Sequence, residues 1–185
     1  MIELYIARHG QTEENVQRVL QGQMPGHLTQ EGIQQAKELR DKLRDVSFDR
    51  IITSDLKRAV DTTRIICEAH DVEFELEPLL RERDFGIHTG GPYIKISHAL
   101  DPSAETMEQL SQRAADFLNG LKAKDKGRVL AVSHGLFLRV LQAVYHGVPV
   151  REVEKMENAE VRILTLSPDM HFSAVIQEET GGTAN

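Results

Sequence analysis

Short apolar segments alternate with longer segments of helical period along this chain, and this alternation is the feature that most limits the possible folds. Residues 2–7, 51–53 and 129–132 are short and mostly apolar, as is typical of strands buried on both faces. The segments that follow them carry apolar residues on one helical face. The pattern predicts an α/β fold, a three-layer α/β/α sandwich with a largely parallel central sheet.

Capping residues and apolar spacing place the other elements. Thr29 is a suitable N-cap for a helix with its apolar face over residues 33–43, and Ser54 for one with its face over 56–67. Two more helices are expected, over 107–121 and after His134, and further strands over 72–76, 161–166 and 172–176. Residues 86–103 contain a Gly-Gly-Pro turn and no sustained period, which indicates a loop or small cap.

Length and charge limit the organisation and the partners. The 185 residues fit one domain, expected over 1–177, with a flexible tail over 178–185. The formal net charge of −7, without a basic stripe, argues against a nucleic-acid or anionic-membrane partner. No apolar run approaches membrane-spanning length, and the single cysteine, Cys67, fits a reducing compartment. We therefore expect a cytoplasmic protein whose oligomeric state the sequence leaves open.

Two histidines, each followed by glycine, come where predicted strands end. One is in Arg8-His9-Gly10 and the other in Ser133-His134-Gly135. Ligands bind at the carboxyl ends of strands in open α/β sheets, so both imidazoles are expected at one crevice. The arginine beside His9 points to an anion, of which phosphate is the commonest. A lone histidine after a strand is more often structural, but two in the same context favour a shared site.

Further motifs occur in a fixed order around these histidines. They are Arg8-His9-Gly10 with Thr12, Glu13 and Asn15, Leu28-Thr29 with Gly32, Ser54-Asp55-Leu56-Lys57-Arg58-Ala59 with Thr62, Leu80-Arg81-Glu82 before Phe85-Gly86, and Ser133-His134-Gly135. Together they resemble the histidine phosphatase superfamily, the phosphoglycerate mutase-like proteins. The resemblance implies the family's α/β/α fold, with no metal and no cofactor.

The resemblance also implies a role for each site residue. His9 would be the nucleophile, Glu82 the proton donor, and the phosphate pocket would be formed by Arg8, Asn15, Arg58 and His134. Neutral imidazole is a competent nucleophile near pH 7, and a backbone carbonyl on its other nitrogen would fix the tautomer. The two arginines would hold phosphoryl oxygens and lower the pKa of nearby histidines. Glu82 would give a proton to the leaving oxygen and later take one from water.

Two assignments keep a rival interpretation. Asn15 is as well suited to capping a turn as to binding phosphate, and Glu82 lies in a run of charged residues that is also typical of an exposed cluster. The chain also departs from the family pattern. It has no Trp, residues 87–90 replace a common acidic-Trp-Glu-Gly run, and Ala104-Glu105-Thr106 replaces a common Gly-Glu-Ser, upstream of Arg113. Specificity is expected to depend on residues 87–103 and on Gln21, Gly22, Gln23, Arg81 and Arg83.

These features together predict a metal-independent phosphatase that hydrolyses small phosphorylated metabolites through a phosphohistidine on His9. Phosphoglycerate mutase-type transfer is the first alternative, and a catalytically silent domain that binds phosphorylated ligands is the second. A zinc hydrolase using His9, His134 and a carboxylate is a third, which insensitivity to a chelator would dismiss. The remaining histidines show no paired metal-ligand spacing.

Overall fold

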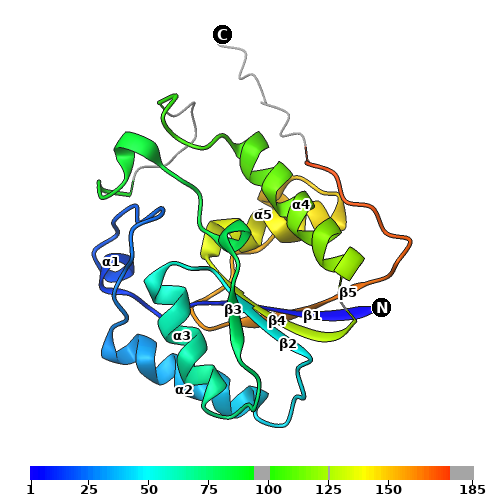
Figure 1. Cartoon of the computed structure of the whole chain (residues 1–185). Coiled ribbons are helices and arrows are strands. Elements are labelled where there is room, and N and C mark those ends of the chain that lie inside the picture. The colour runs from blue at the N-terminus through cyan, green and yellow to red at the C-terminus, as the bar shows by residue number, and fades with distance from the viewer. Residues whose placement is uncertain (94–100, 125, 176–185) are drawn as a thin grey trace.

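The computed structural model describes residues 1–93, 101–124 and 126–175 and contains a mixed five-stranded sheet (Figure 1). The strand order is β3-β2-β4-β1-β5. Its strands are β1 (Ile2–Arg8), β2 (Arg50–Thr53), β3 (Phe74–Leu76), β4 (Gly127–Ser133) and β5 (Val161–Leu166). All neighbours run parallel except β5, which pairs antiparallel with β1 at the edge. The predicted α/β fold with a largely parallel sheet is confirmed.

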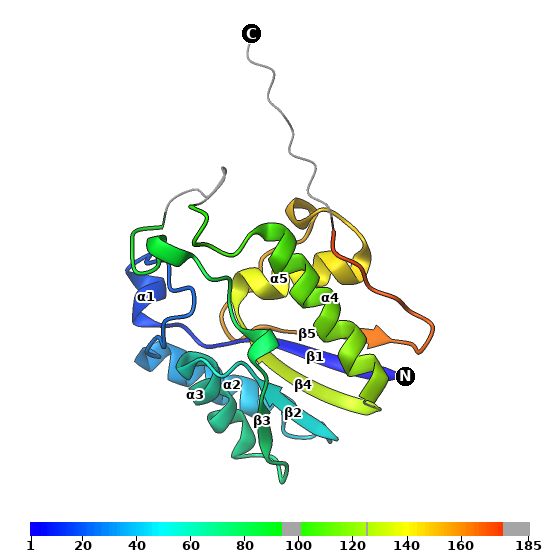
Figure 2. The same cartoon turned by 45° about the horizontal axis from the view of Figure 1, so that its top comes forward.

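Helices cover both faces of the sheet (Figures 1 and 2). On one face lie α2 (Gln30–Leu43) and α3 (Lys57–Cys67), and on the other α4 (Met107–Lys124) and α5 (Gly135–His146). Each layer encloses its own apolar core, one including Leu39, Ile51 and Ile66, the other Leu4, Leu118 and Phe137. Within the described ranges, no helix is both long and apolar enough to cross a bilayer.

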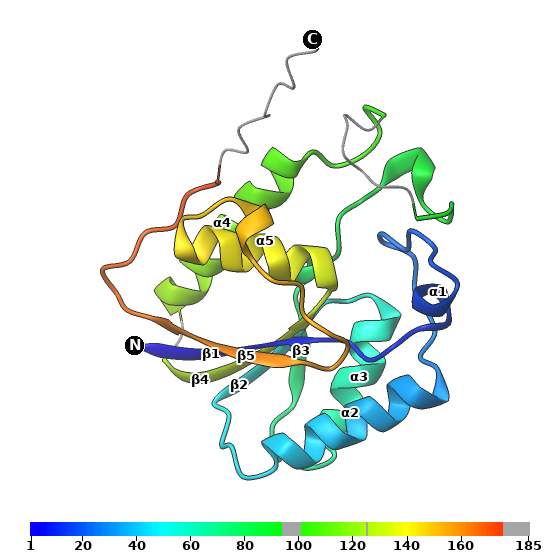
Figure 3. The ribbon, with the colours of Figure 1, turned by 180° about the vertical axis from the view of Figure 1, so that it is seen from behind.

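Shorter elements lie around the carboxyl ends of the parallel strands. They are helix α1 (Glu13–Val16) and the 3₁₀ turns Pro78–Leu80, Gly86–His88 and Val150–Glu152. The view from behind shows α1 and its loops beside the start of α3 (Figure 3). The strand register aligns the carboxyl ends of these strands. Arg8 pairs with Ser133 at the ends of β1 and β4, and Thr53 of β2 pairs with Val132 of β4. Residues that directly follow these strands are therefore held close together.

The helix predicted after Thr29 is confirmed, with that residue as its N-cap, since its hydroxyl accepts from the Gly32 N–H at 2.9 Å. The prediction for Ser54 is wrong. Leu56 is the N-cap of α3 and makes no side-chain cap bond, while the Ser54 hydroxyl bonds the His134 ring at 2.7 Å. Capping preference identified a polar residue near the helix start, but its hydroxyl bonds His134, a residue far away in the sequence.

The late strand predicted over 172–176 is also wrong for the described part, 172–175, which has no strand. Its backbone binds side chains of α4 instead of a neighbouring strand. The Phe172 N–H and carbonyl bond the Asn119 amide, and the Val175 N–H donates to the Ser111 hydroxyl. Residues 176–185, with the predicted tail over 178–185, lie outside the described residues, as do residues 94–100 of the predicted cap.

Candidate active site

His9 follows β1 directly, in a backbone packed against the start of α2. A Cβ atom on Gly10 would stand 2.4 Å from the Gly32 carbonyl oxygen, so only glycine permits this approach. The His9 side chain is 2% exposed, and its Nδ1 lies 2.7 Å from the Gly10 carbonyl oxygen. A carbonyl oxygen only accepts, so Nδ1 carries the proton and Nε2 keeps its lone pair.

The surroundings of His9 keep its ring neutral. Burial is the largest cause, and the positive charges of Arg58 and Arg8 add to it, so the pKa of His9 lies well below its usual value of 6.5. The hydrogen bond to the Gly10 carbonyl acts in the opposite direction but is a smaller cause. At neutral pH the ring is therefore a nucleophile rather than a cation.

Arg58, at the start of α3, is held by two backbone carbonyls of the preceding loop. Its Nη2 donates to the Gly22 carbonyl at 2.7 Å, and its Nη1 donates to the Met24 carbonyl. The side chain is 1% exposed, and burial lowers its pKa to about 10. The Nε atom is buried and has no hydrogen-bond partner. One donor of a fixed guanidinium thus stays available.

Arg8, the last residue of β1, is like Arg58 in having a terminal nitrogen bound to a backbone carbonyl and an Nε without a partner. Its Nη1 donates to the Met156 carbonyl at 2.7 Å, and its Nε is buried with no partner. Burial lowers the Arg8 pKa, an effect that the charge of Glu82 opposes. Both arginines thus combine anchored terminal nitrogens with a buried Nε that has no partner, and both line the same pocket.

His134 lies beside His9, with ring centroids 5.2 Å apart. It is fully buried, its Nε2 bonds the Ser54 hydroxyl at 2.7 Å, and its Nδ1 has no partner. Burial and the charge of Arg58 hold its pKa well below 6.5. Four buried side-chain atoms lack partners in the described part of the chain, and three of them belong to this cluster: Arg8 Nε, Arg58 Nε and His134 Nδ1. The Ser54 hydroxyl already accepts from the Leu56 N–H at 3.3 Å, so it donates its proton to His134 Nε2 and the ring proton is assigned to Nδ1. An oxyanion is the ligand that three such donors suit.

Glu82 follows the turn Pro78–Leu80, and its carboxylate lies at the N-terminus of α5. Oε1 accepts from the Arg83 and Phe137 N–H groups, at 2.8 and 3.0 Å, and Oε2 accepts from the Leu136 N–H at 3.0 Å. The residue is 9% exposed, so the exposed-cluster interpretation of Glu82 is wrong. Oε1 uses both lone pairs, whereas Oε2 uses one and keeps the other for a ligand.

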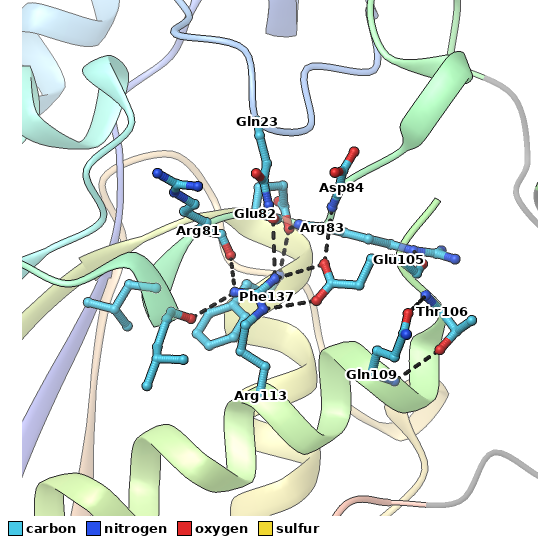
Figure 4. A network of polar contacts seen from close by, with 12 residues as sticks. Gln23, Arg81, Glu82, Arg83, Asp84, Glu105, Thr106, Gln109, Arg113 and Phe137 are labelled. Carbon is cyan, nitrogen blue, oxygen red and sulfur yellow. Dashed lines mark hydrogen bonds and ion pairs between the residues drawn. The ribbon is translucent and has the colours of Figure 1, made fainter. Parts of the chain in front are cut away.

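A polar network fixes the segment that carries Glu82 (Figure 4). Arg113 of α4 forms a two-bond pair with Glu105, at 2.9 Å for each bond, and donates to backbone carbonyls of the Glu82 segment. Its guanidinium also lies over the Phe137 ring, 4.8 Å from the centroid. The network joins α4, the Glu82 segment and the start of α5.

A pocket of about 490 Å³ opens over these groups. Of the predicted site residues, Arg8, His9, Asn15, Gln21, Gly22, Arg58 and Glu82 line it. His134 contacts His9 but is not in this lining, which covers the described residues. Gln23 and Arg81 are not in it either. Gln23 reaches the Glu82 carbonyl at 3.4 Å, and Arg81 pairs with Asp55 at 2.7 Å.

Asn15 and Gln21 have structural partners in addition to their place at the pocket. The Asn15 side chain completes a capping box with Thr12, and its Oδ1 also accepts from Asn158 at 3.3 Å. The Gln21 Oε1 accepts from the Thr12 hydroxyl at 3.1 Å. The capping interpretation of Asn15 is confirmed, and its role toward phosphate stays a prediction. Gly22 adopts a φ of +50°, which favours glycine, and presents its carbonyl to Arg58.

The rim of the pocket holds cations that sequence reasoning missed. These are Arg139 of α5, Arg151 and Lys155. Among the described residues, Glu82 is the only acidic side chain in the lining. Arg139 lies one helical turn after Gly135, a spacing from which its place could have been found. Arg151 lies in the 3₁₀ turn Val150–Glu152 and Lys155 in the loop after it, and neither position gives such a signal.

The fold and this site correspond to a known family. The model of the histidine phosphatase superfamily (branch 1) matches residues 4–177. A probable phosphoglycerate mutase GpmB from Enterobacter sp. (strain 638) is 34% identical over 165 residues, which cover 80% of this chain and 77% of that protein. The chain therefore belongs to the histidine phosphatase superfamily.

Solved structures agree with this assignment. YhfR of Bacillus stearothermophilus has a TM-score of 0.84 at 25% identity, over 96% of each chain. The alpha-ribazole phosphatase of Shigella flexneri has a TM-score of 0.82 at 26% identity, over 94% of this chain and 95% of that one. Phosphatases and mutases are both named among the proteins that this chain resembles, so it belongs with enzymes of phosphoryl chemistry.

Proposed function

We propose that this protein is a metal-independent phosphomonoesterase that hydrolyses small phosphorylated metabolites through a phosphohistidine on His9. The observation that carries the proposal is the Nδ1 bond to the Gly10 carbonyl. It leaves the Nε2 lone pair on a buried neutral ring, in a pocket that two anchored arginines also line. A nucleophile between fixed cations is the arrangement that attack on a phosphoryl group needs.

In the first half of the reaction, His9 Nε2 attacks phosphorus and the bond from phosphorus to the leaving oxygen breaks. Arg8 Nε, Arg58 Nε and His134 Nδ1 donate to the phosphoryl oxygens, whose charge they stabilise in the transition state. Glu82 gives a proton from Oε2 to the leaving alcohol oxygen. The products are the free alcohol, the phosphohistidine and an ionised Glu82.

In the second half, the Glu82 carboxylate takes a proton from a water molecule whose oxygen attacks phosphorus. The nitrogen–phosphorus bond breaks, its electron pair returns to His9 Nε2, and inorganic phosphate leaves. Glu82 is then protonated for the next cycle. Neither half of the cycle needs a metal ion, and the described residues contain no group of three metal-ligating side chains suited to one.

Phosphoglycerate mutase chemistry is the second candidate, favoured by the similarity to the probable phosphoglycerate mutase GpmB. A mutase must keep water from its phosphoenzyme until a second alcohol attacks. Residues 86–93 do cover one side of the pocket, since Gly90 and Gly91 bond Leu20 and Tyr93 bonds Arg18 through their backbones. We propose that residues 86–103 are too few to close the pocket, so that water attacks the phosphohistidine faster than a second alcohol does.

The test is incubation with p-nitrophenyl phosphate and, separately, 3-phosphoglycerate, with chelator and no added metal. We expect phosphate release from at least one phosphomonoester in a screen of sugar phosphates, phosphoglycerates and nucleotides, and little 2-phosphoglycerate. Rapid interconversion of the phosphoglycerates without phosphate release would establish the mutase instead. Loss of activity in chelator, restored by zinc, would overturn the metal-independent mechanism. We place this activity in the cytoplasm, consistent with the lone Cys67.

A further inference from the structure

Four consecutive backbone carbonyls lead into Glu82, and side chains from other elements bind all of them. Arg113 donates to the carbonyls of Leu79 and Arg81 at 2.7 Å and to that of Glu82 at 3.3 Å. The Ser133 hydroxyl donates to the Leu80 carbonyl at 2.6 Å. A loop segment with every carbonyl held in this way has a fixed path, and so has the side chain that it carries.

Arg113 uses all of its N–H donors in holding this segment and Glu105. A guanidinium has five N–H donors, and those of Arg113 go to three carbonyls and to both oxygens of Glu105. Glu105 is tied to the same segment a second time, because its Oε2 accepts from the Asp84 N–H at 3.1 Å and its carbonyl accepts from Arg83 Nε at 2.7 Å.

Arg113 is also linked to the Glu82 carboxylate through Phe137. The Arg113 guanidinium lies over the Phe137 ring, and the Phe137 N–H is one of the three donors to the Glu82 carboxylate. The same arginine therefore holds the backbone of Glu82 and packs on the residue that binds its side chain (Figure 4). Neither Arg113 nor Glu105 lines the described pocket.

We propose that Arg113 and Glu105 form a positioning pair that sets Glu82 Oε2 at the leaving oxygen. This inference rests on the proposed acid–base role of Glu82. Lysine at position 113 keeps the charge but has three donors on a point-like ammonium, which cannot hold three carbonyls and a two-bond carboxylate together. A misplacement near 1 Å at a reacting group can cost about 10²-fold in rate.

A merely structural pair would act differently. Loss of general stability lowers the amount of active enzyme and affects every substrate by the same factor. Misplacement of the acid alone affects substrates in proportion to their need for a proton. Alkyl phosphates need it because an alkoxide is a poor leaving group, whereas nitrophenolate departs without help. The leaving group thus separates positioning from stability.

The experiment measures kcat/KM, which reports the phosphorylation of His9 and excludes the dephosphorylation step that both substrates share. The substrates are glycerol phosphate and p-nitrophenyl phosphate, and the variants are Arg113→Lys, Glu105→Gln, Glu82→Gln and the double variant Glu82→Gln with Arg113→Lys. We expect Arg113→Lys and Glu105→Gln to lose about 10- to 100-fold on glycerol phosphate and only a few fold on p-nitrophenyl phosphate. In the double variant, the loss from Arg113→Lys should vanish, because the group it positions is gone.

The matched control is Arg50→Lys. Arg50 also makes a two-bond pair, with Glu75 at 3.0 and 2.8 Å, but it lies at the amino end of β2, on the opposite edge of the sheet. We expect no change in kcat/KM for either substrate. Circular dichroism and thermal unfolding report whether each variant is folded, and Glu105→Gln tests the proposal if Arg113→Lys does not fold.

The outcomes separate the two claims. If Glu82→Gln lowers kcat/KM equally for both substrates, the role of Glu82 as proton donor fails. If Glu82→Gln lowers kcat/KM selectively for glycerol phosphate but the folded Arg113 and Glu105 variants lower it equally for both substrates, the positioning pair is overturned. A full additional loss from Arg113→Lys in the Glu82→Gln background overturns it as well.

Discussion

Two regions meet at the pocket, and they differ in how their polar atoms are used. The cluster of Arg8, Arg58 and His134 around His9 leaves three buried nitrogens without partners. The segment around Glu82 leaves no carbonyl unbound between residues 79 and 82, and Arg113 has no free donor there. Unused buried donors are costly unless a ligand binds them.

The difference indicates a division of work. The histidine and arginine cluster has buried nitrogens without partners, and under the proposed function a phosphoryl group would bind them. The Glu82 segment is complete without a ligand, and therefore holds its one reactive oxygen in place before the substrate arrives. Under the proposed function, one region binds charge and the other delivers a proton, so changes in the two should have different kinetic consequences.

The largest expected effect comes from removing the nucleophile. We expect His9→Ala to lower kcat by about 10⁴-fold or more, since loss of a covalent nucleophile has effects of that order. The fold should remain, because His9 lies at the carboxyl end of β1 and belongs to neither apolar core. The measurement is phosphate release with protein folding checked by circular dichroism. Undiminished turnover by His9→Ala would remove the covalent step from the account.

The next effect tests the unpartnered donors. We expect Arg58→Ala and His134→Ala each to lower kcat by about 10²-fold or more, the scale for losing one preorganised donor. Arg58→Lys should fail too, because an ammonium cannot reach two carbonyls and a phosphoryl oxygen together. Steady-state kinetics on p-nitrophenyl phosphate provide the comparison. Near-normal rates for Arg58→Lys would show that the planar guanidinium of Arg58 is not needed for turnover.

A smaller effect concerns pH and stability. The pKa of His9 and of His134 is well below 6.5 in the folded protein, whereas an unfolded histidine titrates near 6.5. Below that pH the unfolded chain binds more protons, so this stability is complete above pH 6.5 and is lost as the pH falls toward the folded pKa.

Urea unfolding at pH 7.5, 6.5 and 5.5 measures this dependence. We expect the slope of the unfolding free energy with pH, below 6.5, to decrease in His134→Gln by up to about 1.4 kcal/mol per pH unit, the value for one proton. An unchanged slope would show that His134 is not held neutral by the fold.

The smallest expected effect is at Arg81. Its guanidinium pairs with Asp55, is 39% exposed and does not line the described pocket. We expect Arg81→Gln to change kcat/KM by less than about twofold and stability by less than about 1 kcal/mol, as for other exposed pairs. A loss comparable with that of Arg58→Ala would place Arg81 in the binding region after all.

Sequence reasoning reached the residues whose place depends on the ends of strands. His9 and His134 follow β1 and β4, and a parallel sheet brings such positions together whatever separates them in the chain. It did not reach contacts made by side chains across the fold. The Ser54 hydroxyl bonds the His134 ring in addition to the Leu56 N–H, and the backbone of Phe172 and Val175 binds α4 rather than a strand.

The cationic rim was missed for a related reason. Lys155 lies in a loop whose path depends on tertiary contacts, such as the donation from Arg162 to the Lys155 carbonyl at 3.2 Å. Arg113 was visible in the sequence, but its five bonds depend on where α4 packs. Periodicity identifies that a residue faces the interior, and only the packed structure shows which carbonyls it meets.

The most direct test of the central claim is to trap the phosphoenzyme. Wild-type protein is mixed with ³²P-labelled substrate, quenched rapidly and mapped for the labelled residue, with His9→Ala as the control. The account predicts one label on His9, labile to acid and stable to alkali as a phosphoramidate is, and none in the variant. The account would be contradicted by an active enzyme that carries no label after quenching in alkali, or that carries the label on a residue other than His9.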